Sequence, residues 1–105
     1  MTMGGESNAT DTLIDDVKNY LQITWEDEAT DRRIGGLIAS GKAYLDRKLG
    51  EQGDYTVPGT PRTLLFEYVR YARDAALDVY ENNYRSLILM MQNEVRANAV
   101  EVEST

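Results

Sequence analysis

The stretch IGGLIASGKAYLDRKLG, residues 34–50, decides the fold that we expect, because its apolar residues recur at the spacing of a helix. One stripe of this helix consists of large apolar residues and one glycine: Ile34, Ile38, Gly41, Leu45 and Leu49. A glycine inside a helix costs about 1 kcal/mol relative to alanine, so we interpret Gly41 as the point where a second helix approaches closely. The small surface that we expect to face it is formed by Ala72, Ala75 and Ala76. A hinge or a neutral residue is the alternative.

The other two glycines of this stretch fall on a different face of the helix, among small side chains. This small-residue face consists of Gly35, Gly36, Ala39, Ser40 and Ala43. A solvated helix normally carries Lys, Glu or Gln at such positions. We therefore predict a second contact surface for a neighbouring element or another subunit, and an exposed face without a role is the alternative.

The remaining sequence predicts further helices and no convincing strand. The expected N-terminal caps of the first three helices are Thr12 with Asp15, Thr24 with Asp27, and Thr60 followed by Pro61. The second helix should end before Gly50, and Pro58-Gly59 fits a tight turn in the loop that follows. The third helix is expected to reach about Tyr80, with a break at Asn82-Asn83 before a fourth helix.

The fold class predicted from these elements is all-α. We expect a single domain over residues 1–105, built as a small bundle of about four helices with a Gly/Pro-containing loop between the second and third. Residues 1–11 and 97–105 are expected to be flexible tails. Trp25 is expected to cover the junction of the first two helices as a core residue.

A second candidate interface follows the predicted third helix, on the side opposite its apolar stripe. Helical spacing aligns an aromatic residue, two arginines and a leucine into a row: Phe66, Arg70, Arg73 and Leu77. Aromatic and arginine side chains are typical anchors of protein interfaces. Leu89 and Met90 likewise fall outside the apolar stripe of the fourth helix. Several two-faced helices in so small a domain indicate a protein that is surrounded by partners.

The amino-acid composition excludes several classes of function. The chain has 105 residues, 11 basic against 18 acidic side chains, and a formal net charge of −7. Such a charge disfavours unspecific binding to nucleic acid or anionic membranes. Histidine and cysteine are both absent, so the usual bases, nucleophiles and transition-metal ligands are missing, and we expect no enzyme, cofactor or metal site. The N-terminal sequence lacks the pattern of a secretory signal, and no apolar run is long enough for a bilayer, so we expect a soluble intracellular protein.

Residues 12–91 resemble the head–tail connector, or adaptor, proteins of long-tailed bacteriophages. A short helix of the family form T-x-x-[DE]-V-K-x-x-L is approximated, with one extra residue, by Thr12, Asp15, Asp16, Val17, Lys18 and Leu21. Spaced aspartates and a long helix with L-I-x-x-[AG] and Tyr-Leu follow, here Asp27, Asp31, Leu37, Ile38, Gly41, Tyr44 and Leu45. After a glycine-containing loop, LLFEYVRYARDAALDVYENNY is similar to the family's next helix.

The resemblance implies a structural role in a phage or prophage virion. Members of this family form a ring, usually twelve-fold, that binds the portal protein, carries the stopper or tail-completion protein, and surrounds the channel through which DNA passes. It implies no catalysis and no cofactor, and it places the protein at the head–tail junction, or in the host cytoplasm before assembly. The alternative is a small helical protein-interaction or regulatory module. A helix-turn-helix DNA reader is disfavoured, because the Arg32-Arg33 pair is too little for a basic recognition helix.

Overall fold

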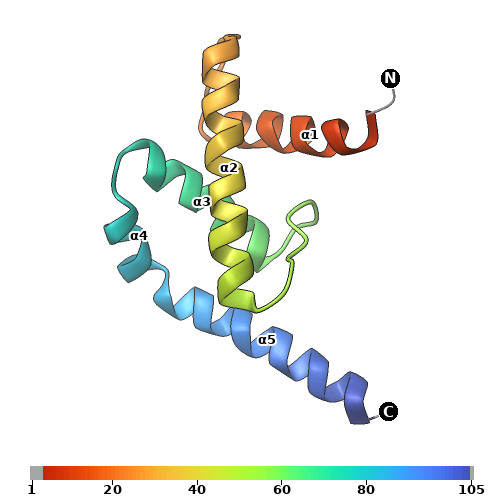
Figure 1. Cartoon of the computed structure of the whole chain (residues 1–105). Helices are drawn as coiled ribbons and strands as arrows, with labels where there is room; N and C mark the ends of the chain where they lie inside the picture. Colours follow the sequence, from red (N-terminus) through yellow and green to blue (C-terminus); the bar gives the residue numbers. More distant parts are fainter. Residues whose placement is uncertain (1–3, 105) are drawn as a thin grey trace.

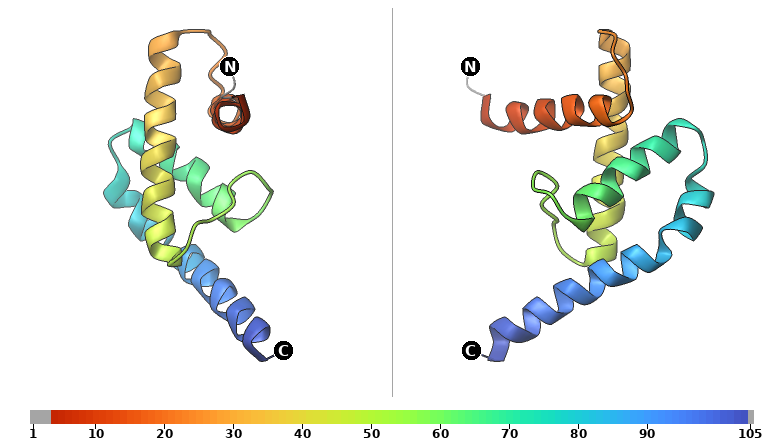
Figure 2. Two further views of the ribbon diagram at one scale, coloured as in Figure 1. Left: turned by 45° about the vertical axis from the view of Figure 1, so that its right-hand side comes forward. Right: turned by 180° about the vertical axis from the view of Figure 1, so that it is seen from behind.

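A computed structural model describes residues 4–104, and over that range the protein consists of five helices without a strand (Figure 1). The helices are α1 (Gly4–Tyr20), α2 (Glu28–Leu49), α3 (Thr60–Arg73), α4 (Leu77–Asn83) and α5 (Arg85–Ser104). The all-α class is confirmed. The arrangement differs from a bundle, because α1 crosses α2 at a steep angle and α5 leaves the body obliquely (Figure 2).

Helix α2 is the central element, and both of its ends are capped. The Asp27 carboxylate accepts hydrogen bonds from the Thr30 backbone N–H at 3.0 Å and from the Thr30 hydroxyl at 2.8 Å. At the other end Gly50 adopts a left-handed conformation with φ of 80°, which glycine reaches without steric cost. The predicted end of the helix is confirmed. Thr24 is not the cap, because the helix begins only after Asp27.

Gly41 lies where α2 meets α3. A Cβ atom on this residue would lie 2.7 Å from Cδ1 of Leu65 and 2.8 Å from Cδ1 of Tyr68, both closer than carbon atoms pack. The predicted close approach is therefore confirmed. The facing side chains are different from those expected, because Leu65 and Tyr68 fill the site and Ala75 is exposed.

The two outer helices extend further than the sequence predicts. Helix α1 begins at Gly4 and α5 continues to Ser104, so the backbone over 4–11 and 97–104 is helical, and the flexibility expected of these segments stays a prediction. Thr12 lies inside α1 and does not begin it. Residues 1–3 and 105, which belong to the predicted tails, lie outside the described residues.

The predicted third helix is divided into α3 and α4. Gly59, with φ of 151°, precedes α3, so Thr60 is the first helical residue and not the cap. The helix ends at Arg73, and Ala75 takes a positive φ of 56° that turns the chain. Tyr80 thereby becomes fully buried, and its hydroxyl donates a 2.9 Å hydrogen bond to the Leu64 carbonyl oxygen. Tyr84 separates α4 from α5, which confirms the predicted break near Asn82-Asn83.

The core lies where α1, α2, α3, α4 and the first half of α5 meet. Its fully buried side chains are Leu13, Val17, Ile34, Ile38, Leu45, Leu64, Leu65, Val69, Tyr80 and Met91. Outside this region α1 and α5 project (Figure 1). The radius of gyration of 15.0 Å exceeds the value of about 13 Å expected for a compact domain of this size. The molecule therefore presents an unusually large surface for its length.

Candidate interaction surfaces

The small-residue face of α2 is divided between the protein interior and the surface. Gly35 is half-buried, and a Cβ atom there would lie 3.4 Å from Cδ1 of Ile14 on α1. Gly36 has no such neighbour within 4 Å, and Ala39 and Ala43 are exposed. One part of this face is thus covered by a neighbouring element. The use of the exposed part as a subunit contact stays a prediction.

The row of Phe66, Arg70, Arg73 and Leu77 does not form. Phe66 is only 6% exposed, with the Tyr20 ring 5.3 Å from its centroid and the Arg62 guanidinium 4.6 Å above it. Leu77 belongs to α4, beyond the turn at Ala75 that ends the alignment. Phe66 is a core residue, and its replacement by a charged side chain is expected to unfold the protein.

A sequence signal for the burial of Phe66 was present. The run LLFEYV, residues 64–69, is almost continuously apolar, and every residue in it is buried. A helix that is apolar all round is enclosed by other elements on several sides. Here α2 packs on one side, while α1 and α5 cover others.

The two arginines of the row have different environments. Arg73 is half-buried, whereas the exposed Arg70 pairs with the buried Glu67 at 3.1 Å. Glu67 also accepts hydrogen bonds from the Tyr84 hydroxyl, at 2.8 Å, and from the Tyr20 hydroxyl. Burial, and then the hydrogen bond to Glu67, raises the pKa of Tyr20 to about 12. This cluster joins α1 and α3 to Tyr84 at the junction of α4 and α5, so its evident role is structural.

Large apolar side chains are exposed at several separate places. Trp25, expected in the core, is 52% exposed, and its indole N–H donates to the Thr30 hydroxyl at 3.4 Å. Leu89 and Met90 are exposed on α5, as their positions outside the apolar stripe predict. Single exposed apolar residues are common on protein surfaces. Each of these residues therefore indicates an interaction site only where neighbouring side chains form one with it.

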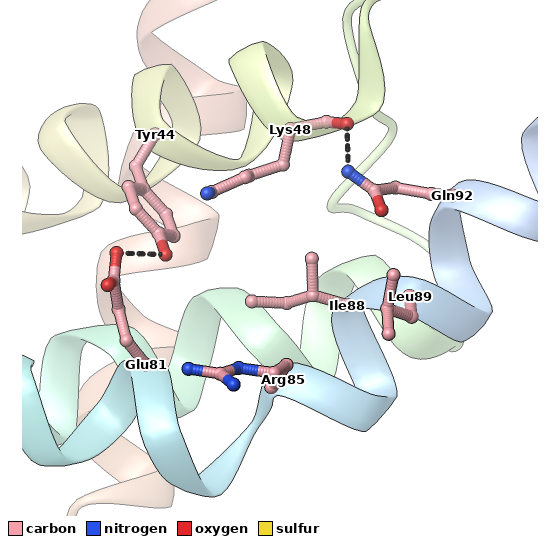
Figure 3. A pocket seen from close by; sticks show the side chains of 7 residues that line it. All are labelled: Tyr44, Lys48, Glu81, Arg85, Ile88, Leu89 and Gln92. Atoms are coloured by element: carbon pink, nitrogen blue, oxygen red, sulfur yellow. Dashed lines mark hydrogen bonds between the residues drawn. The ribbon is translucent and has the colours of Figure 1, made fainter.

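An open pocket of about 230 Å³ lies between the end of α2 and the α4–α5 segment (Figure 3). We call it the α2–α5 pocket, and its lining residues are Tyr44, Lys48, Glu81, Arg85, Ile88, Leu89 and Gln92. The Tyr44 hydroxyl donates to Glu81 at 2.8 Å, and the Gln92 amide donates to the Lys48 carbonyl oxygen at 2.8 Å. The sequence does not indicate this pocket, because its walls come from segments far apart in the chain.

The chemistry of the α2–α5 pocket is mixed. Ile88 and Leu89 form an apolar floor, and Figure 3 shows Ile88 pointing into the space between Lys48 and Arg85. The Lys48 ammonium lies 5.4 Å from the centroid of the Tyr44 ring. Such a site is suited to an apolar group that carries carboxylates beside it.

The described residues offer neither a metal site nor a membrane span. Over residues 12–98, the range whose side chains are described, acidic side chains nowhere gather in a group of three that could hold a metal ion. Within the same range no helix has the length and hydropathy needed to cross a bilayer.

No protein-family model, curated protein or solved structure matches this chain.

Proposed function

We propose that this protein is a head–tail connector subunit of a long-tailed phage or prophage. In this role copies of the chain form a ring beneath the portal vertex, join the head to the stopper or tail-completion protein, and surround the DNA channel. The ordered motifs over residues 12–91 support the family, and the all-helical structure agrees with it. The role needs no catalysis, in keeping with a chain that has neither histidine nor cysteine.

The observation that carries the proposal is that exposed large apolar side chains, among others on the surface, lie near both ends of α2. Trp25 stands before the start of α2, whereas Leu89 and Met90 lie on α5, which packs against the other end of α2. A ring subunit meets two neighbours through two different surfaces, because a contact repeated around an axis is heterologous. Surfaces at opposite ends of an elongated domain meet this requirement.

The test is assembly with the portal protein of the same phage. The purified chain is mixed with portal-bearing heads and imaged by electron microscopy, with heads alone as the control. We expect an added ring at the portal vertex. A chain that leaves the portal bare but binds another protein instead would support the alternative, a helical interaction or regulatory module.

A further inference from the structure

We propose that Trp25 of one copy inserts into the α2–α5 pocket of a second copy, with the carboxylates beside Trp25 facing Lys48 and Arg85. The inference deepens the proposed function, since it rests on ring formation and names the contact between neighbouring subunits. Its test nevertheless uses the isolated chain, so that it stands or falls separately from portal binding.

The inserted segment is the turn before α2. Trp25 is 52% exposed, and Glu26, Asp27 and Glu28 follow it directly in the sequence. The Asp27 carboxylate caps helix α2. The Glu28 side chain is 94% exposed, and its ion pair with Arg32, at 3.8 Å, is long and open to solvent. A large aromatic side chain with adjacent carboxylates is thus presented to solvent without a covering element.

The receiving surface has the complementary character. Ile88 and Leu89 supply an apolar floor, and Leu89 is 53% exposed although it borders a pocket. Among the described side chains, residues 12–98, neither Lys48 nor Arg85 has an ion-pair partner. The one acidic residue of the pocket, Glu81, already accepts the hydroxyl of Tyr44. The pocket can therefore accept an aromatic ring and leaves two cations for the carboxylates next to it.

The geometry requires the two surfaces to come from different copies. Trp25 hydrogen-bonds to the first turn of α2, whereas Tyr44 and Lys48 belong to its last turns. These positions are separated by more than about 20 Å along the helix axis. Insertion of one end into the opposite end of the next copy is a head-to-tail contact, which closes into a ring or continues as a filament.

The distribution of charge favours the same contact. The turn that carries Trp25 contributes the carboxylates Glu26, Asp27 and Glu28, and Lys18, which lies near it, is already paired with Asp31 at 2.8 Å. An acidic end approaching a pocket with Lys48 and Arg85 accelerates association and fixes its orientation. The contact should therefore weaken as the salt concentration rises.

The experiment uses two variants that each lose one half of the contact. Trp25→Ser removes the inserted side chain and keeps the pocket, whereas Leu89→Asp damages the pocket and keeps Trp25. Both positions are about half exposed, so circular dichroism should show an unchanged helical fold. By sedimentation velocity, we expect each variant alone to self-associate at least about tenfold more weakly than the parent chain.

The mixture of the two variants gives the decisive measurement. The Leu89→Asp variant keeps Trp25, which can insert into the intact pocket of the Trp25→Ser variant. The resulting pair cannot grow, because one copy now lacks Trp25 and the other has a damaged pocket. We expect the equimolar mixture to form dimers that do not grow, whereas the parent chain forms larger species. Val57→Ser is the matched control, because Val57 is 50% exposed but lies in the loop between α2 and α3, and this variant should associate like the parent.

Two results would overturn the inference. One is a Trp25→Ser or Leu89→Asp variant that associates as the parent does, and the other is a parent chain that stays monomeric up to about 1 mM. Either result leaves the portal experiment to decide the connector function. Conversely, the expected dimers together with a bare portal would support the contact and contradict the connector function.

Discussion

Gly41 and Gly36 lie in the same helix but have different surroundings. A Cβ at Gly41 would press against the ring of Tyr68 at 2.8 Å and the end of Leu65 at 2.7 Å. The leucine end can rotate away, but the tyrosine ring is held in the core. We expect Gly41→Ala to lower the free energy of unfolding, and Gly41→Leu to lower it by about 1–3 kcal/mol, because overpacking strains the α2–α3 contact.

Gly36→Ala is the matched control for this prediction. A Cβ at Gly36 meets nothing within 4 Å, so the gain in helix propensity is not opposed by a clash. We expect about 0.5–1 kcal/mol of added stability. Urea unfolding followed by circular dichroism measures all three variants. A Gly41→Leu variant as stable as the parent would contradict the close-packing interpretation.

The phenol of Tyr20 makes stability sensitive to alkaline pH. Its pKa is raised to about 12, chiefly by burial and then by the hydrogen bond to Glu67, whereas in the unfolded chain it titrates near 10. The folded state therefore keeps a proton that the unfolded state has lost. The contribution of Tyr20 is complete below about pH 10, and it is lost as the pH rises from about 10 to 12.

The corresponding measurement is the free energy of unfolding over this alkaline range. We expect the parent to lose stability as the pH rises, and Tyr20→Phe to show a shallower decline, because phenylalanine has no proton to lose. Tyr44 has a pKa of about 12 for related reasons, burial and a hydrogen bond to Glu81, so Tyr44→Phe should behave similarly. Equal slopes in the parent and both variants would contradict this account.

At the scale of the element, the turn between α3 and α4 has an unusual backbone. Ala75 adopts φ of 56°, a left-handed conformation that costs an L-residue roughly 1–2 kcal/mol. We expect Ala75→Gly to stabilise the fold by about 0.5–1 kcal/mol, because the relief of strain exceeds the added entropy of the unfolded chain. Thermal unfolding measures the change.

The neighbouring residue provides the control. Ala76 has φ of −124°, which alanine adopts freely, so Ala76→Gly should destabilise the protein. If both substitutions destabilise it equally, the positive φ at Ala75 carries no strain. The comparison is informative because both substitutions remove a methyl group from the same short turn.

This turn also explains which elements the sequence could predict. Helix α2 was predictable because its signals are local: an acidic start, a periodic apolar stripe and Gly50 at its end. The division between α3 and α4 was not, because Asp74, Ala75 and Ala76 contain no helix-breaking residue. It depends on distant contacts, namely the burial of Tyr80 and its hydrogen bond to Leu64.

The candidate surfaces also divide into features with a local sequence signal and features that depend on distant contacts. The close contact at Gly41 was predictable from one helix. The burial of Phe66 was not predicted, because periodicity gives the phase of a helix but does not say how many elements surround it. The exposure of Trp25 was likewise missed, since large aromatic residues are usually buried.

At the scale of the whole molecule, the projecting helices separate surfaces that a compact bundle would bring together. The principal extents are 49, 39 and 19 Å, so the protein is flat and elongated. The α2–α5 pocket arises from this arrangement, and the sequence did not reveal it because it joins α2 to the α4–α5 segment. A flat subunit with different surfaces at its two ends is suited to heterologous assembly.

The last prediction concerns nucleic acid, and it depends on charge over the whole molecule. The net charge is −7, and four of the described basic side chains already pair with carboxylates: Lys18 with Asp31, Arg32 with Glu28, Arg62 with Asp16, and Arg70 with Glu67. Duplex binding gains most of its unspecific affinity from cations that replace counterions along the phosphates. We therefore expect no measurable binding to a duplex at physiological salt.

Fluorescence anisotropy with a labelled duplex, titrated over a series of salt concentrations, measures this. A basic DNA-binding domain under the same buffers is the positive control, and its affinity should fall steeply with salt. For this chain we expect a flat signal at every salt concentration, because its net charge of −7 leaves few cations for the phosphates. The proposed connector role requires the same property of the protein that surrounds the DNA channel. Submicromolar binding that weakens steeply with salt would favour a DNA-binding regulator over the proposed connector, because such binding depends on basic side chains that replace counterions along the phosphates.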